Sequence, residues 1–472
     1  MSKKLIFIVL ACLSLNAVAQ GYKLTFEPQK PIEGTYYIGQ HFKDKFILFD
    51  SATLNNGSIV FSGKRAIVPG VYALLDKGQS KLFDFMIDGS TKFSIAFDEK
   101  RSNAGMKVKG SEANRLMYEY MAKIDWARAR SKELKNGSDE MKALSAEMDA
   151  YEKAYFQKNA KYRFTQLITM FRNDELPDNL PDDNAKAAYF RTHYWDKIDL
   201  TDHSLIYTPQ LFDKMNYYFF GLLYYQHADT ITRCAERLLD RVADDSTMLR
   251  YFLDFVLPKY ERATKNVGWD QVFVNLVQNY YLQGKCPWAT EADLYSKRNT
   301  IEYLSHSLIG AMGQELFMAD TNQQSDARYW ISSHRCPERY VILWFWDPDC
   351  HHCQEQSAEL ASLVDSLDAI GQRRFQVYAI GYEADVAKWK RYLREHHMPF
   401  VNVGGSNVNI DYQEAYNVHS APTMIVLDAD RRVIMNKVLP VKSILPFLDN
   451  YEKEHPDMAT KVSPWMMYRR TQ

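Results

Sequence analysis

The chain has 472 residues and a formal net charge of −1, with 46% hydrophobic and 25% charged residues. This length is enough for two to four domains with apolar cores. The balanced charge argues against a nucleic-acid-binding protein and against a polybasic protein of the membrane surface. Six cysteines in a chain of this length exclude a small scaffold held together by many disulfides.

The first residues are typical of an export signal. Lys3 and Lys4 precede an apolar run over residues 5–15, and Ala17–Ala19 offers small residues for cleavage. We therefore predict a signal peptide over residues 1–19 and a mature protein in the periplasm or cell envelope. Residues 9–12 could instead form a lipoprotein box with Cys12 lipidated, which the short apolar stretch before it disfavours. No later segment is long and apolar enough to cross a bilayer.

Residues 20–110 have the pattern of a β-rich domain. Asn55–Gly57 is a tight-turn sequence between expected strands at 45–50 and 58–63. Further strands are expected at 69–75, 82–87 and 91–97. Short strands at this spacing predict a β-sandwich, in which we recognise no set of catalytic residues.

From residue 111 to about residue 305 the hydrophobic period becomes helical. Leu116, Tyr120 and Ile124 recur at steps of four, as they would on one face of an α-helix. We predict a central α-helical domain over residues 111–305. Cys234 falls within a helical pattern as a small apolar residue, and a disulfide between Cys286 and Cys336 has little support.

From residue 306 onwards, expected strands and helices alternate. Strands are expected at 340–345, 375–380, 423–427 and 433–438, and helices at 353–370, 386–396 and 443–455. The order β-α-β-α-β-β-α predicts an α/β domain over residues 306–455, followed by a C-terminal tail over residues 456–472.

The strongest chemical signal is Cys350-His351-His352-Cys353, which closely follows the apolar run 340–344. A Cys-x-x-Cys pair where a helix begins is typical of a redox-active site. The nucleophile of disulfide exchange is a thiolate, and the N–H groups at a helix N-terminus favour an anion at Cys350. The alternative is a metal site that includes His351 or His352. No second ligand pair lies nearby in the sequence, so we expect no metal.

Two separated motifs resemble a known family. Phe345-Trp346 with Cys-x-x-Cys after three residues, and His419-Ser420-Ala421-Pro422-Thr423 before a later strand, resemble the thioredoxin superfamily. Within it, the exported TlpA/ResA-like thiol-disulfide oxidoreductases are the most similar group. The resemblance covers about residues 306–455 and implies a thioredoxin-like fold. The whole layout is also similar to Bacteroidetes envelope proteins that carry a β-rich and a helical domain of unknown function ahead of such a domain.

The resemblance implies a role for each residue of the two motifs. Cys350 would attack a disulfide, and Cys353 would resolve the mixed disulfide. A cis peptide bond before Pro422 would expose the backbone of Ala421, so that Ala421, Pro422 and Thr423 hold a substrate strand.

Four residues beside the cysteine pair are expected to tune its redox properties: Trp346, Asp349, His351 and His352. In the superfamily, a histidine just before the second cysteine is associated with the more oxidising members, because an imidazole there would stabilise the thiolate. His351 could add to this effect or could point to solvent. The carboxylates of Asp347 and Asp349 act in the opposite direction.

Three positions depart from the family pattern. Trp344 stands where many thioredoxins bury an aspartate that transfers a proton to the resolving cysteine. Gln356 replaces a glutamate common in the TlpA/ResA-like group, and Ala358 replaces a helix proline. Glu355 and Glu359 lie on the same expected helix, so the sequence leaves the route of the proton open.

These features predict an exported thiol-disulfide oxidoreductase that acts on protein disulfides through Cys350 and Cys353. The resemblance favours a reductase recharged by a membrane electron donor, while His352 keeps oxidase or isomerase activity open. The two sulfurs need no cofactor, and the sequence does not indicate an oligomeric state. The alternative is a non-catalytic envelope binding protein with a degenerate thioredoxin-like module, which the missing buried acid favours.

Overall fold

The computed structural model describes residues 21–172, 176–261, 266–320, 330–381, 385–408, 411–418 and 420–462. The predicted signal peptide, with the lipoprotein alternative at Cys12, and His419 lie outside the described residues. The chain divides into two compact units, Met1–Tyr224 and Tyr225–Gln472, and the predicted helical region runs across this division. Within the described ranges, no helix combines the length and the apolar character of a membrane span.

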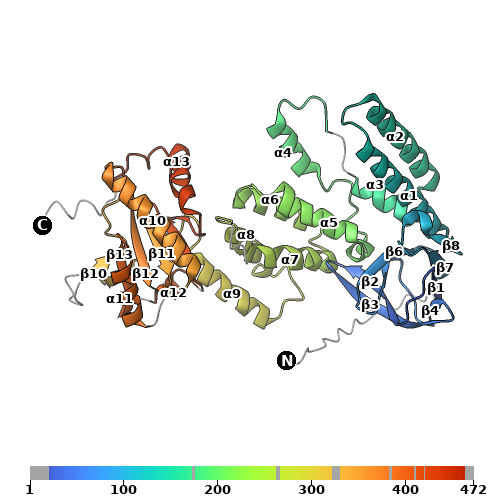
Figure 1. Cartoon of the computed structure of the whole chain (residues 1–472), viewed down its shortest axis with the longest axis horizontal. Helices are drawn as coiled ribbons and strands as arrows, with labels where there is room; N and C mark the ends of the chain where they lie inside the picture. The colour runs from blue at the N-terminus through green and yellow to red at the C-terminus, as the bar shows by residue number, and fades with distance from the viewer. Residues whose placement is uncertain are drawn as a thin grey trace. The chain divides into compact units, whose positions relative to one another are not determined.

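The first unit begins with an eight-stranded sheet of strand order β6-β5-β2-β3-β4-β1-β7-β8 (Figure 1). The long strand β3 pairs with β2 and then, through Leu54 and Asn55, with β4, so the sheet bends into two facing halves. Between the halves, the Phe26 ring lies 5.2 Å from the Phe85 ring and 6.0 Å from the Phe83 ring, measured between centroids. The predicted β-sandwich is therefore confirmed. Its strands are β1 (Tyr22–Pro28), β2 (Thr35–Phe42), β3 (Lys45–Asn55), β4 (Ser58–Gly63), β5 (Gly70–Leu75), β6 (Lys81–Ile87), β7 (Lys92–Phe97) and β8 (Lys107–Lys109).

The predicted tight turn joins β3 to β4. Asn56 and Gly57 have φ values of 46° and 76°, in the left-handed region that these two residue types tolerate well. The sequence pattern did not reveal β1, β2 or β8. In β2 the reason is that buried Gln40 and His41 interrupt the alternation of apolar and polar residues on which strand prediction depends.

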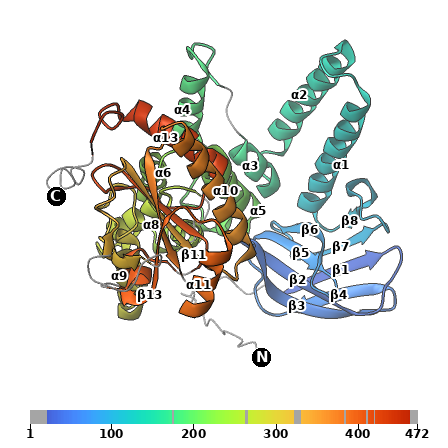
Figure 2. The same cartoon turned by 60° about the vertical axis from the view of Figure 1, so that its left-hand side comes forward.

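Helix α1 covers the outer strand β6. The buried Asn114 accepts the Met86 N–H through Oδ1 at 2.7 Å and donates from Nδ2 to the Met86 carbonyl at 2.8 Å. One side chain thus pairs both backbone groups, as a further strand would. Figure 2 shows α1 and α2 side by side. The α-helices of this unit are α1 (Glu112–Glu133), α2 (Asp139–Asn159), α3 (Arg163–Phe171), α4 (Asp183–His193) and α5 (Pro209–Tyr217).

The second unit starts with more helices, so the prediction of a central helical region is confirmed. They are α6 (Ala228–Asp240), α7 (Ser246–Glu261), α8 (Asp270–Leu276) and α9 (Glu291–Ser305). Their core contains fully buried Ile231, Phe252, Val256 and Val272. A short π-helix, Val277–Tyr281, continues α8.

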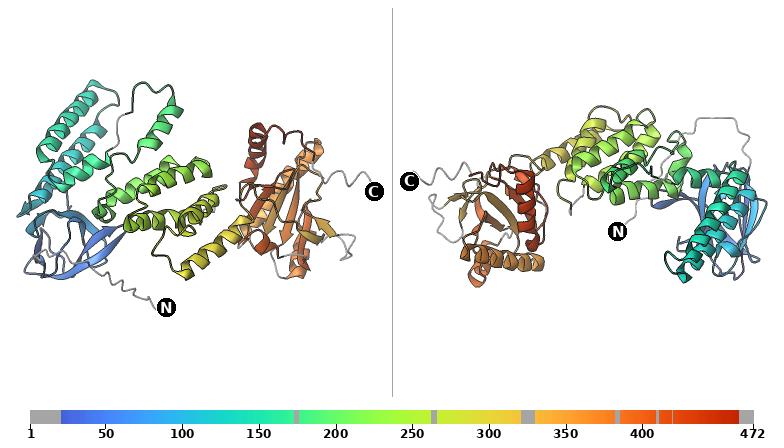
Figure 3. Two further views of the ribbon diagram at one scale, coloured as in Figure 1. Left: turned by 180° about the vertical axis from the view of Figure 1, so that it is seen from behind. Right: turned by 90° about the horizontal axis from the view of Figure 1, so that it is seen from above.

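A seven-stranded sheet of order β10-β9-β13-β12-β11-β14-β15 completes the second unit. Figure 3 shows strands and helices of this part of the chain in orange and red. Strand β11 lies between the parallel strand β12 and the antiparallel strand β14. Its alternate residues enter two cores, because successive side chains of a strand point to opposite faces. Trp344 and Trp346 enter the core that α10, α11 and α13 cover, and Phe345 enters the core beside α12. The predicted C-terminal α/β domain is confirmed.

The bounds of this domain's elements are close to those expected. Its strands are β9 (Phe317–Asp320), β10 (Trp330–Ser332), β11 (Tyr340–Trp346), β12 (Phe375–Gly381), β13 (Val401–Val408), β14 (Thr423–Leu427) and β15 (Val433–Met435). Its helices are α10 (His351–Ala369), α11 (Val386–Glu395), α12 (Tyr412–Ala415) and α13 (Ile444–Glu454). Strands β9, β10 and β13 were not predicted. Strand β13 contains Gly404, a residue type depleted in strands, but a Cβ at Gly404 would come within 2.8 Å of the Trp389 ring.

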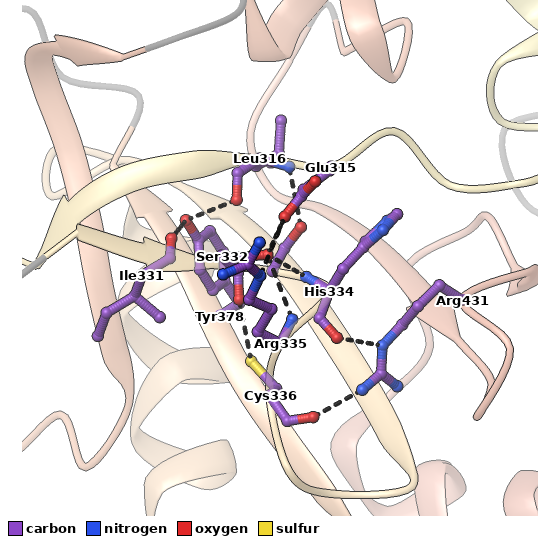
Figure 4. Close-up of polar contacts among 10 residues, drawn as sticks. Glu315, Leu316, Ile331, Ser332, His334, Arg335, Cys336, Tyr378 and Arg431 are labelled. Carbon is purple, nitrogen blue, oxygen red and sulfur yellow. Dashed lines mark hydrogen bonds and ion pairs between the residues drawn. The ribbon is translucent and has the colours of Figure 1, made fainter. Parts of the chain in front are cut away.

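A fully buried arginine fixes the segment that leads into β11. The Arg431 guanidinium donates to the carbonyls of His334 at 2.9 Å and of Cys336 at 2.6 Å (Figure 4). It also donates to the carbonyls of Arg339 and Asp428, at 3.2 and 3.1 Å. Arg431 lies between the antiparallel strands β14 and β15 and thereby joins that hairpin to the segment before the central strand.

Candidate active site

Cys350 lies at the N-terminus of α10. It is the N-cap residue, and its Sγ accepts the backbone N–H of Cys353 at 3.2 Å. The Cys350 side chain is half-buried, whereas that of Cys353 is fully buried one helical turn later. A helix N-terminus favours an anion at this position, because its N–H groups have no partners within the helix.

A short loop between β11 and α10 places the first cysteine. Asp347 Oδ1 accepts the Asp349 N–H at 2.7 Å, and the Asp347 carbonyl accepts the Cys350 N–H at 3.2 Å. Gln354 Nε2 donates to the Pro348 carbonyl at 2.7 Å. These bonds close the turn Asp-Pro-Asp directly after the buried strand, so that α10 begins at His351.

The second thiol is held in its protonated form. Burial raises the pKa of Cys353 to about 12, and a hydrogen bond to Cys350 and the charges of Cys350 and Asp347 act in the same direction. A hydrogen bond from the Asp347 backbone partly opposes this shift. The two cysteines therefore differ in access, and the raised pKa of the buried Cys353 opposes thiolate formation there.

The structure brings the second sequence motif next to the first. The peptide bond between Ala421 and Pro422 is cis, as the resemblance implied. The carbonyl oxygen of Ala421 lies 3.9 Å from Cys350 Sγ. Thr423 starts β14 opposite Phe345, at the end of the strand that leads to the cysteines. Ala421, Pro422 and Thr423 are each half-buried, so this segment borders the first sulfur while remaining partly accessible.

Asp349 forms an ion pair with Lys388, which lies in the first turn of α11. The lysine compensates a carboxylate that the sequence places directly beside Cys350. Sequence reasoning did not identify Lys388, because nothing in the amphipathic pattern of that helix distinguishes it from the neighbouring Lys390.

The two histidines between the cysteines point to solvent. The side chains of His351 and His352 are 83% and 62% exposed, and both lie near Glu355, at 3.3 and 3.8 Å. Glu355 and Glu359 are also exposed, so neither is a buried acid beside the sulfurs. The expected tuning by the histidines stays a prediction.

Aromatic residues line the buried side of the pair. Trp346 is fully buried, and its ring centroid lies 5.2 Å from that of Tyr392. The pKa of Tyr392 is raised by burial and also by the charge of Cys353. Trp344 is fully buried, and its Nε1 donates to Ser357 Oγ at 2.9 Å. An indole–hydroxyl bond thus occupies the place where many thioredoxins bury an aspartate.

A groove of about 460 Å³ runs beside the first turn of α10. On α10 its lining runs from His351 to Ser362, and the remaining lining residues lie at and after the end of α11: Tyr392, His396, His397 and Met398. His351 is the one residue between the two cysteines that lines the groove, and neither cysteine lines it.

The remaining cysteines take no part in this site. None of Cys234, Cys286, Cys336, Cys350 and Cys353 forms a disulfide. In the described ranges, no three His, Cys, Asp or Glu side chains gather as a potential metal site.

Three family models match the chain. Residues 22–117 match a domain of unknown function (DUF4369), and residues 137–304 match another (DUF5106). Residues 338–433 match a thioredoxin-like family. No curated protein matches the chain.

Several solved structures are similar in part. A thioredoxin-like protein from Bacteroides caccae is 18% identical with a TM-score of 0.49, covering 60% of this chain and 98% of its own. The thioredoxin domain of a thiol-disulfide oxidoreductase from Bacteroides vulgatus is 17% identical with a TM-score of 0.26, covering 30% and 96%. A thiol:disulfide interchange protein from Bacteroides sp. is 14% identical with a TM-score of 0.25, covering 31% and 90%. The family model and the strand order around β11 identify the C-terminal part of the chain as a thioredoxin-like domain that follows two domains of unknown function.

Proposed function

We propose that the protein is an exported thiol-disulfide oxidoreductase that acts on protein disulfides through Cys350 and Cys353. The observation that carries this proposal is the position of Cys350. It is half-buried at a helix N-terminus, 3.2 Å from the Cys353 N–H and 3.9 Å from the Ala421 carbonyl. An accessible sulfur, a buried partner one turn away and an adjacent backbone segment are the parts that disulfide exchange needs.

In the reducing direction the reaction has two steps. The Cys350 thiolate attacks one sulfur of a substrate disulfide, whose S–S bond breaks, and the departing substrate thiolate takes up a proton. Cys353 then loses its proton and attacks the sulfur of Cys350. The second substrate thiolate leaves and takes up a proton, and an S–S bond joins Cys350 to Cys353. Overall, the protein dithiol loses two electrons and two protons and becomes a disulfide, and the substrate disulfide gains two electrons and two protons and becomes a dithiol.

The reducing direction requires a donor that returns two electrons to the oxidised pair. The resemblance to exported reductases supports a membrane electron donor in this role. The reduction potential of the pair decides the direction. We expect a value near about −270 mV, as in thioredoxin, whereas a value of about −120 to −180 mV would make the protein an oxidant or isomerase.

Insulin reduction in the presence of dithiothreitol tests the proposal. We expect activity from the wild type and loss of activity in Cys350→Ser. Reduced Cys353→Ser, mixed with insulin after dithiothreitol has been removed, should form a long-lived mixed disulfide. Cys234→Ser is the matched control, because Cys234 lies on α6 and takes no part in the pair. Equal activity of the wild type and the double Cys350→Ser/Cys353→Ser variant would refute the oxidoreductase.

The alternative is a binding protein, which the bond between Trp344 and Ser357 supports because no acid occupies that place. Partners trapped on Cys353→Ser separate the two functions. Partners that reduction releases support the enzyme, and partners that survive reduction support the binding protein.

A further inference from the structure

The loop that follows β15 runs beside the proposed substrate segment. Strand β15 is antiparallel to β14, with Met435 opposite Val426. Residues after Met435 therefore run back toward the start of β14, where Ala421 and Pro422 lie. We call residues 436–439 the β15 loop. Its Val438 and Leu439 pack, partly buried, against the same apolar cluster as Cys350 and Ala421.

Residues far away in the sequence, at the start of α8 and after α9, hold this loop. Asn436 donates from Nδ2 to Asp270 Oδ2 at 2.8 Å and to the Ser307 carbonyl at 2.9 Å. Its Oδ1 accepts the Gly268 N–H at 3.3 Å. Lys437 Nζ lies 3.4 Å from Asp270 Oδ2. Asp270 thus contacts both polar residues of the β15 loop, Asn436 and Lys437, and Gly268 just before α8 contacts Asn436.

Burying the Asp270 carboxylate in this place costs free energy of folding. Its side chain is 3% exposed, and its Oδ1 has no hydrogen-bond partner among the described residues. Burying a carboxylate costs free energy that one partly buried lysine offsets only in part, and apolar residues often replace such pairs without loss of stability. Stability alone therefore does not account for Asp270, whereas fixing the β15 loop in one position does.

We propose that Asp270 is a positioning residue for disulfide exchange, because it holds the β15 loop as one wall of the site where a substrate peptide meets Cys350. The inference rests on the proposed function. It gives the end of the segment that matches DUF5106, residues 137–304, a part in binding protein substrates. The substrate class is that of the proposed function, a cystine within a peptide, and the β15 loop would contact the peptide beyond the cystine.

Two substrates of different size test this inference. Insulin is a peptide substrate that would contact the β15 loop beyond its disulfide, whereas dithiobis(nitrobenzoate) is small and reaches Cys350 without needing that loop. We expect Asp270→Ala to lower kcat/KM for insulin by about tenfold, a size typical of lost substrate positioning. The rate with dithiobis(nitrobenzoate) should stay within about twofold of wild type, since Cys350 itself is not moved. Asp229→Ala, which removes an exposed carboxylate from the first turn of α6, is the matched control and should leave both rates unchanged.

The ratio of the two rates separates positioning from loss of folded protein, which lowers both rates together. An equal fall for both substrates, or an unchanged insulin rate in folded Asp270→Ala, overturns the inference. If Asp270→Ala does not fold, Asp270→Asn and Asn436→Ala weaken the same contacts more gently and are judged by the same ratio. Failure of the proposed function is distinct, because it appears in the wild type as activity no higher than that of Cys350→Ser/Cys353→Ser, and this result overturns both.

Discussion

Asp349 and Lys388 form an ion pair that ties the loop before Cys350 to the first turn of α11. Asp347 has a different role, because its charge is one of the causes that raise the pKa of Cys353. The sequence Asp-Pro-Asp presents the two carboxylates as equivalent. The structure directs one toward a lysine and leaves the other to act on the buried thiol.

Replacing Asp347 should therefore make the resolving cysteine more reactive. Asp347→Asn keeps the oxygen that accepts the Asp349 N–H but removes the charge, so the pKa of Cys353 should fall. The measurement is release of thionitrobenzoate from a mixed disulfide formed at Cys350, because this release needs the Cys353 thiolate. The Asp347 charge is the smallest of the causes that raise this pKa, so we expect about two- to threefold faster release at neutral pH.

Asp349→Asn is the control on the same loop. Asp349 is not among the causes that shift the pKa of Cys353, so its removal should leave the release rate unchanged. Slower release in Asp347→Asn would contradict the electrostatic interpretation. It would mean that Asp347 accepts the proton of Cys353, in place of the acid that Trp344 replaces.

Much of the thioredoxin-like domain was predictable from local pattern, and the contacts that complete its site were not. The apolar run of β11, the Cys-x-x-Cys pair and Ala421-Pro422 are short continuous signals, and the structure brings them together. Lys388 pairs with a residue 39 positions away, and Asp270 bonds to one 166 positions away. Such pairs depend on how packed elements meet, which hydrophobic periodicity does not specify. Strand β13 was missed because its Gly404 packs against the Trp389 ring and does not follow strand propensity.

The raised pKa of Cys353 also predicts how the stability of the reduced protein depends on pH. An unfolded chain releases this proton near the ordinary value of 9.0, whereas the folded protein keeps it up to about 12. Between these values the folded state binds more protons, so the free energy of unfolding must fall as pH rises. The contribution of this group is complete below about pH 9 and decreases by about 1.4 kcal/mol for each pH unit above it.

Urea unfolding of the reduced protein at about pH 8.5 and about pH 10 measures this effect. The difference between wild type and Cys353→Ser isolates one thiol from the tyrosines, which also titrate in alkali. We expect the wild type to lose more stability than Cys353→Ser over this interval. Parallel losses in the two proteins would mean that Cys353 ionises as easily when folded as when unfolded.

The burial of the cysteines predicts their order of alkylation. In the reduced protein, iodoacetamide should modify Cys350 first, because its sulfur is half-buried at a helix N-terminus, and activity should fall in step. Cys286, Cys336 and Cys353 are buried and should react only after urea is added. Mass spectrometry of peptides taken at intervals gives the order. Cys234, which is also half-buried but lies on α6, shows how much partial exposure alone contributes.

The hydrogen bonds of the buried Arg431 guanidinium predict that Arg431→Lys lowers the free energy of unfolding, although this substitution keeps the charge. Arg431→Lys places a compact ammonium where a planar guanidinium now reaches the carbonyls of His334, Cys336, Arg339 and Asp428. At least one buried carbonyl then lacks a donor, at a cost of about 1–3 kcal/mol for each such group. We expect the free energy of unfolding to fall by about 2 kcal/mol or more in urea denaturation.

Arg432→Lys is the control. It changes the adjacent exposed arginine, which donates to the Gly310 carbonyl at 2.9 Å, and should alter the free energy of unfolding by less than about 1 kcal/mol. Equal effects of the two substitutions would show that the buried carbonyls find other donors.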